Sequence, residues 1–122
     1  MEMSKEGKDE KTRKRERLTA ITGIGDKATI ERLGPKEAAA GLIALERLRN
    51  NEDIARWINQ GRDIVLDGPQ LVAITLSNQE DMEAAHRIEP LLMGAFCCGQ
   101  SAAGFLQKYN DLHMEFSSIA SE

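Results

Sequence analysis

Residues 91–112, LLMGAFCCGQSAAGFLQKYNDL, are apolar or small on nearly every side if they form a helix. A helix with so little polar surface must be buried. The part from Leu91 to Leu106 has 16 residues, whereas a membrane-spanning helix needs roughly 20. We therefore predict a central core helix over about residues 91–112 and no membrane segment. The predicted packing residues are Leu92, Ala95, Phe96, Gly99, Ala102, Ala103, Leu106 and Tyr109 on one side, and Leu91, Cys98, Phe105 and Leu112 on another.

Two of the helices predicted before this stretch lie between residues 35 and 61. The first covers about residues 35–49 and begins at Pro35, because proline is favoured at the first helical position. Asn51 then offers an N-cap for a short amphipathic helix that continues until Gly61. The stripe expected to face the core in the first helix consists of Ala38, Gly41, Leu42, Leu45 and Leu48.

The apolar runs 64–66 and 71–76 allow two structures. They fit a small β-hairpin, but Pro69 fits the start of a helix equally well. We prefer a helix for the second run, because an isolated two-stranded hairpin is only marginally stable.

Ser77 and Glu80 have the spacing of a capping box, which predicts a helix over about residues 78–88. Pro90 is expected to end or kink that helix. The predicted fold is therefore all-α, with four to six short helices packed around the apolar helix at 91–112.

Composition limits the chain to a single small domain, since it has 122 residues. Aromatic residues make up only 4%, which argues against an all-β sandwich. Two cysteines are too few for a disulfide scaffold. We expect a cytoplasmic protein, because the chain shows no apolar signal peptide.

Charge divides the chain into two parts. Residues 1–62 carry 14 basic and 11 acidic side chains, whereas residues 63–122 carry two basic and nine acidic ones. Residues 1–17 hold too little apolar surface to offset the entropy of ordering them. We predict a flexible charged arm over 1–17 and one helical domain over 18–122.

The N-terminal region also suggests a nucleic-acid-binding function. Its basic cluster consists of Lys11, Arg13, Lys14, Arg15 and Arg17. The stretch 18–33 resembles the hairpin of helix-hairpin-helix DNA-binding motifs through Gly23-Ile24-Gly25 and Lys27, although the order Lys27-Ala28-Thr29 departs from the pattern of that family. The resemblance implies that Gly23, Gly25 and Lys27 would hold the backbone of duplex DNA without reading its sequence.

No residue pattern predicts catalysis. Cys97 and Cys98 are consecutive, so on a helix they would point about 100° apart and pack in the core instead of sharing a metal ion. His86 and His113 lack partners at a recognisable catalytic spacing. We therefore expect no enzyme activity, no metal site and no cofactor.

Small residues at helical spacing predict close helix packing. Ala95, Gly99 and Ala103 form one line of the apolar stretch, and Leu106 continues it. Their neighbour is either the segment 38–41 within the chain or the same helix of a second subunit, which would make a homodimer.

A small acidic helical body without a catalytic set resembles small bacterial regulators, such as antiactivators and anti-sigma-like proteins. That resemblance implies a protein–protein interaction regulator that sequesters or inhibits a partner such as a transcription factor. Ile54, Trp57 and Ile58 are the predicted partner-binding residues, because tryptophan is enriched at interface hot spots. Core packing is the competing role for Trp57.

Overall fold

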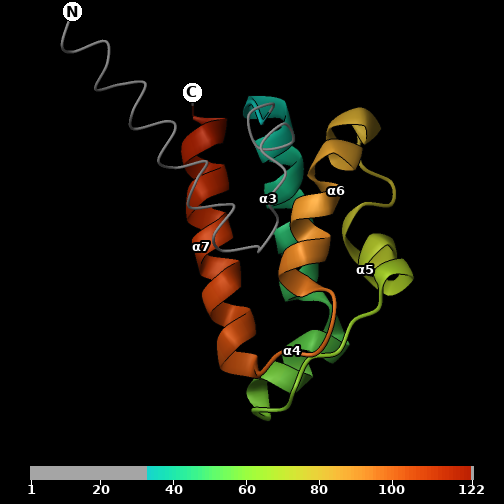
Figure 1. The fold of residues 1–122 in the computed structure, drawn as a ribbon, viewed down its shortest axis with the longest axis vertical. Coiled ribbons are helices and arrows are strands. Elements are labelled where there is room, and N and C mark those ends of the chain that lie inside the picture. Colours follow the sequence, from blue (N-terminus) through green and yellow to red (C-terminus); the bar gives the residue numbers. More distant parts are fainter. Residues whose placement is uncertain (1–32, 122) are drawn as a thin grey trace, which may run out of the picture.

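The computed structural model describes residues 33–121, and these form five helices and no β-strand. The helices are α3 (Pro35–Asn50), α4 (Glu52–Asn59), α5 (Gly68–Thr75), α6 (Met82–Phe96) and α7 (Ala102–Ala120). Helices α3, α6 and α7 lie along the long axis of the molecule, and α4 closes one end (Figure 1). The predicted all-α fold is confirmed. The predicted arm over 1–17 lies outside the described residues.

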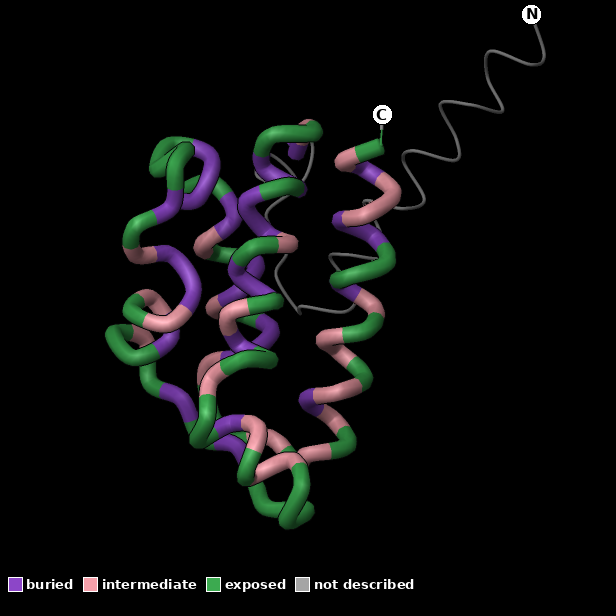
Figure 2. The backbone as a smooth tube through the Cα atoms, turned by 180° about the vertical axis from the view of Figure 1, so that it is seen from behind, coloured by how far each residue is buried: buried purple, intermediate pink, exposed green. Residues whose placement is uncertain are grey.

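Helix α3 is the centre of the bundle, since it contacts each of the other four helices and packs most extensively on α7. Its inward side combines small alanines with two leucines, Leu45 and Leu48, which are fully buried. The prediction that residues 91–112 form the central helix is therefore wrong. The buried apolar residues form one core cluster to which all five helices contribute, and Figure 2 shows buried positions along each of them.

Residues 91–112 belong to two helices, because the segment 97–101 is not helical. Ser101 caps α7: its hydroxyl accepts a hydrogen bond from the Gly104 amide at 3.0 Å. The amide and carbonyl of Gln100 pair with those of Ile64, at 3.0 and 2.7 Å. These local bonds replace helical ones, and the two halves of the apolar stretch meet in the core, where the rings of Phe96 and Phe105 lie 5.1 Å apart.

The helix starts predicted at Pro35, Asn51 and Pro69 are confirmed. Pro35 is the first residue of α3, and the Asn51 side chain accepts from two amides of α4, each at 3.1 Å. The second apolar run forms α5, where Asp67 accepts from the Gln70 amide at 2.7 Å. The first run, 64–66, is extended and pairs with Gln100 through Ile64 instead of forming a hairpin.

The predicted capping box at Ser77 and Glu80 is wrong. Helix α6 begins at Met82, because Asp81 caps it by accepting from the Ala84 amide at 3.0 Å. The Ser77 hydroxyl instead points back to α5, where it donates to the Val72 carbonyl. Pro90 does not end the helix: it lies inside α6, on the exposed side, and the helix continues to Phe96.

Within residues 33–121, every helix is too short or too polar to cross a membrane.

The closest approach between α3 and α7 occurs at Gly41. A Cβ atom at this position would lie 2.6 Å from Cε2 of Phe116, inside the distance that carbon atoms tolerate. Phe116 is fully buried, so its ring has no free space to move into. Gly41 is therefore required by packing, although glycine is a poor helix former.

We expect Gly41→Ala to destabilise the protein by about 1 kcal/mol or more, because the clash with Phe116 outweighs the gain in helix propensity. Urea unfolding followed by circular dichroism measures this difference. The matched control is Phe116→Leu, which makes room for the added methyl group. Gly41→Ala should cost less in the Phe116→Leu background, and an equal cost in both backgrounds would contradict the close-packing explanation.

Candidate functional site

An open depression of about 590 Å³ lies between α3 and α5. We call it the α3–α5 groove; it is lined by Ile43, Glu46, Arg47, Asn50, Asn51, Ala73 and Ile74. Ile43 is 40% exposed, Ala73 is exposed and Ile74 is half-buried. Ile43 is an apolar residue outside the stripe predicted to face the core. Its position in the sequence is therefore consistent with a second apolar surface on this helix. The residues of α5 gave no such sign.

Arg47 fixes α5 against α3. Its guanidinium donates hydrogen bonds to the carbonyl of Ser77 and, at 3.3 Å, to that of Asn78. These carbonyls follow the C-terminal end of α5, where a positive charge is favourable. The buried Gln79 side chain adds a second link, since it donates to the Ala40 carbonyl at 3.2 Å and to the Thr75 carbonyl at 2.9 Å. The walls of the groove are thus held by hydrogen bonds between the two helices.

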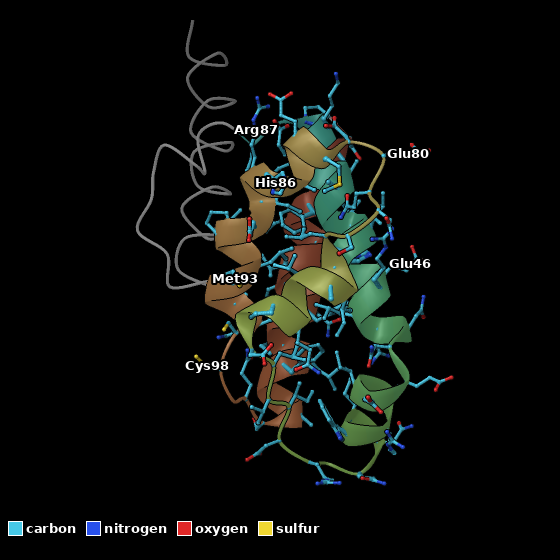
Figure 3. All side chains as sticks on the ribbon, turned by 90° about the vertical axis from the view of Figure 1, so that its right-hand side faces the viewer. Glu46, Glu80, His86, Arg87, Met93 and Cys98 are labelled. Carbon is cyan, nitrogen blue, oxygen red and sulfur yellow. The ribbon has the colours of Figure 1, made fainter. Side chains whose placement is uncertain are left out.

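The described part of the chain is acidic overall. Residues 33–121 carry seven basic and twelve acidic side chains, a net charge of −5. Arg47 directs its charge at carbonyl groups of the chain itself. Glu46 lies exposed on the groove rim, and it takes part in none of the ion pairs formed within the described residues. Figure 3 shows Glu46 pointing away from the body of the molecule. The groove thus has apolar residues in its lining and an exposed carboxylate at its edge.

The three predicted partner-binding residues do not form an exposed surface. Ile54 is fully buried, so its proposed role in binding a partner is wrong; it anchors α4 to the core. Trp57 and Ile58 are half-buried and pack against the same core. The apolar side of α4 therefore packs against the rest of the bundle.

The predicted line of small residues is interrupted. Ala95 is buried in α6, Gly99 is exposed in the 97–101 segment, and on α7 Ala103 is exposed while Leu106 is half-buried. The prediction that these four residues form a single stripe is wrong, because the segment between α6 and α7 is not helical. Close packing does occur at the predicted segment 38–41, but its neighbour is the ring of Phe116. Homodimerisation stays a prediction.

The predicted nucleic-acid residues lie outside the described part of the chain. They are Lys11, Arg13, Lys14, Arg15, Arg17, Gly23, Gly25 and Lys27. Nucleic-acid binding through them stays a prediction.

The two cysteines lie on the segment between α6 and α7. Cys97 is half-buried and Cys98 is exposed, so the prediction that both pack in the core is wrong for Cys98. Burial raises the pKa of the Cys97 thiol, and the neighbouring Cys98 raises it further. His86 and His113 are exposed. Across the described residues, no three His, Cys, Asp or Glu side chains converge as metal ligands.

Glu37 is the buried carboxylate with the best-defined partners. It is 7% exposed, and it accepts from Arg87 of α6 at 2.8 Å and from the Gly34 amide at 3.2 Å. Burial by itself raises the pKa of Glu37, but the hydrogen bonds from Arg87 and the backbone bring it below the ordinary value of 4.5. Arg87 also pairs with Glu83 at 2.5 Å. The group joins α3 to α6, which is a structural role.

We expect the contribution of Glu37 to depend on pH. Because folding lowers the pKa of this carboxyl, its stabilising effect is present above pH 4.5 and is lost as the pH falls through the lowered value. Glu37→Gln should cost about 1–2 kcal/mol at neutral pH and less in acid. Urea unfolding over a pH series measures the difference.

The control for this experiment is Arg87→Met, which removes the main hydrogen-bonding partner of Glu37. The pH-dependent part of the Glu37→Gln effect should shrink in that background. A Glu37→Gln effect that is the same at neutral and acid pH would contradict an ionised carboxylate.

The chain matches no protein-family model, no curated protein and no solved structure.

Proposed function

We propose that this protein is a small interaction protein that holds a segment of a partner protein in the α3–α5 groove, and so sequesters or inhibits the partner. The observation that carries the proposal is the groove itself, in which Ile43, Ala73 and Ile74 present apolar surface to solvent. Apolar surface gathered in a depression with a polar rim is typical of sites that bind other proteins.

The proposed occupant is an amphipathic helix with apolar anchors and basic flanks. A helix presents apolar side chains at intervals of three and four residues, which suits a groove between two helices. The net charge of −5 on the described residues attracts basic flanks and repels acidic ones. Segments that bind DNA are basic for the same electrostatic reason, and this supports a transcription factor as the partner class.

The walls of the groove also support this function. The hydrogen bonds from Arg47 and Gln79 hold α3 and α5 at a fixed separation before any partner arrives. A preformed site avoids the entropic cost of ordering its parts during binding. The groove therefore binds as a rigid surface.

A photo-crosslinking amino acid at Ala73 tests the site in native cells. We expect it to give a covalent adduct with one partner, whose crosslinked peptide is an amphipathic segment with basic residues. With that partner purified, Ile43→Asp should weaken binding at least about tenfold, because it places a charge in the apolar floor. Isothermal titration calorimetry measures the affinity.

Met114 provides the matched control, since it is the most exposed large apolar residue of α7 and lies outside the groove lining. The crosslinker at Met114 should give no adduct with this partner, and Met114→Asp should change the affinity less than about twofold. Equal crosslinking from both positions, or an unchanged affinity in Ile43→Asp, would overturn the proposed site.

The alternative function is sequence-independent nucleic-acid binding through residues 11–27. It is favoured by the separation of charge, because nine of the sixteen basic residues fall within residues 1–32. Gel-shift titration of duplex DNA tests it directly. The alternative predicts an affinity that falls steeply with salt and falls further in Lys27→Glu, whereas Ile43→Asp has no effect. Absence of a shift at low salt would exclude this alternative and leave the groove proposal intact.

A further inference from the structure

The segment between α6 and α7 carries two neighbouring thiols: Cys97 packs against the core, and Cys98 is exposed. Cys98 is exposed, and its backbone has φ 86°, in the left-handed region that residues other than glycine seldom adopt. Gly99 is the next residue and would accept such a conformation without strain. The chain therefore holds a cysteine at a position where the backbone favours glycine.

Hydrogen bonds fix the backbone on both sides of the pair. The Cys97 amide donates to the Met93 carbonyl at 3.0 Å, and the Cys98 amide donates to the Leu66 carbonyl at 3.2 Å. Gln100 is bound to Ile64 by two further hydrogen bonds. The two thiols are thus attached to a framework built from the end of α6 and the extended segment 64–66.

Met93 contributes a thioether to the same end of α6. Met93 is one helical turn before Cys97, and its Sδ is 3.8 Å from the position that a Cβ on Gly68 would occupy. The residue before Gly68, Asp67, is close enough to Cys97 to act on its thiol. Met93 and Cys97 therefore border the same turn at the start of α5. In Figure 3, Met93 and Cys98 lie on one edge of the molecule, at the C-terminal end of α6.

The geometry of adjacent cysteines favours a bridging ion over a disulfide. Every peptide bond between described residues is trans, so the two Cα atoms are about 3.8 Å apart, less than the roughly 4.4 Å minimum usual for disulfides. Two thiolates that share one metal ion, with bonds of about 2.3 Å, can lie up to about 4.6 Å apart, a separation that neighbouring side chains can span. The pair can therefore share an ion, whereas a disulfide would have to form across a Cα separation that is shorter than disulfides prefer.

We propose that Cys97 and Cys98, with the thioether of Met93 one helical turn earlier as a third ligand, form a binding site for a soft thiophilic metal ion, monovalent copper in particular. Thiolate and thioether ligands select soft ions. No third His, Cys, Asp or Glu side chain of the described residues completes the set, which disfavours the four-ligand site that zinc requires. On binding, two S–H bonds break, two Cu–S bonds form and two protons pass to solvent. The oxidation state of copper does not change.

Anaerobic titration of the reduced full-length protein with Cu(I), in competition with bicinchoninate, tests the proposal. We expect one copper ion per chain, with ultraviolet absorption from thiolate-to-copper charge transfer. Cys98→Gly is the decisive variant. Glycine adopts φ 86° without strain, so this variant should be at least as stable as the parent protein but bind copper at least about 100-fold more weakly.

Further variants separate this site from other copper ligands. Met93→Leu should weaken binding, whereas Met3→Leu and Met114→Leu, which change methionines elsewhere in the chain, should not. Retention of one-to-one binding in a folded Cys98→Gly protein would overturn the proposal. Displacement of the copper by equimolar Zn(II), or formation of an intramolecular disulfide in place of copper binding, would also overturn it.

Discussion

The small side chains along α3 are the constraint on which the rest of the bundle depends. Each of the other four helices packs against α3, so the separation of those helices is set by what α3 presents to them. Gly41 admits the Phe116 ring of α7, and buried alanines allow α5 and α6 to lie close on the other sides. A larger side chain on α3 would displace a whole helix, because the interior has no free volume to absorb it.

The groove and the cysteine pair both arise from the short elements around this frame. Helix α5 has only eight residues, so it covers part of α3 and leaves Ile43 exposed beside Ala73 and Ile74. The 97–101 segment is hydrogen-bonded to residues 64–66, and these bonds hold the backbone of the two cysteines in position. In each case a hydrogen-bonded connection positions side chains at the edge of the core, some of them packed against it and others exposed. These are the positions in a small protein where function can be added without loss of packing.

Local signals predicted much of the fold. Pro35, Asn51 and Pro69 lie at helix starts because their chemistry acts over the first turn of a helix, and such local preferences can be recognised without the tertiary structure. Prediction failed where local signals compete. Ser77 and Asp81 could each begin a helix, and only the packing of Gln79 between α3 and α5 decides for Asp81. The apolar residues from 91 to 112 are buried as expected, but periodicity does not reveal that two helices share them. The groove was beyond prediction, because Ile43 and Ile74 are brought together only by the pairing of α3 with α5.

The dominance of the α3–α7 contact has a consequence for synthesis of the protein. The first described helix finds its main partner in the last one, more than fifty residues later in the chain. Until α7 has left the ribosome, the apolar side of α3 has no permanent cover, and the nascent chain exposes the surface that later forms the core. Premature termination before residue 102 would therefore release an aggregation-prone fragment that depends on chaperones, instead of a smaller folded domain.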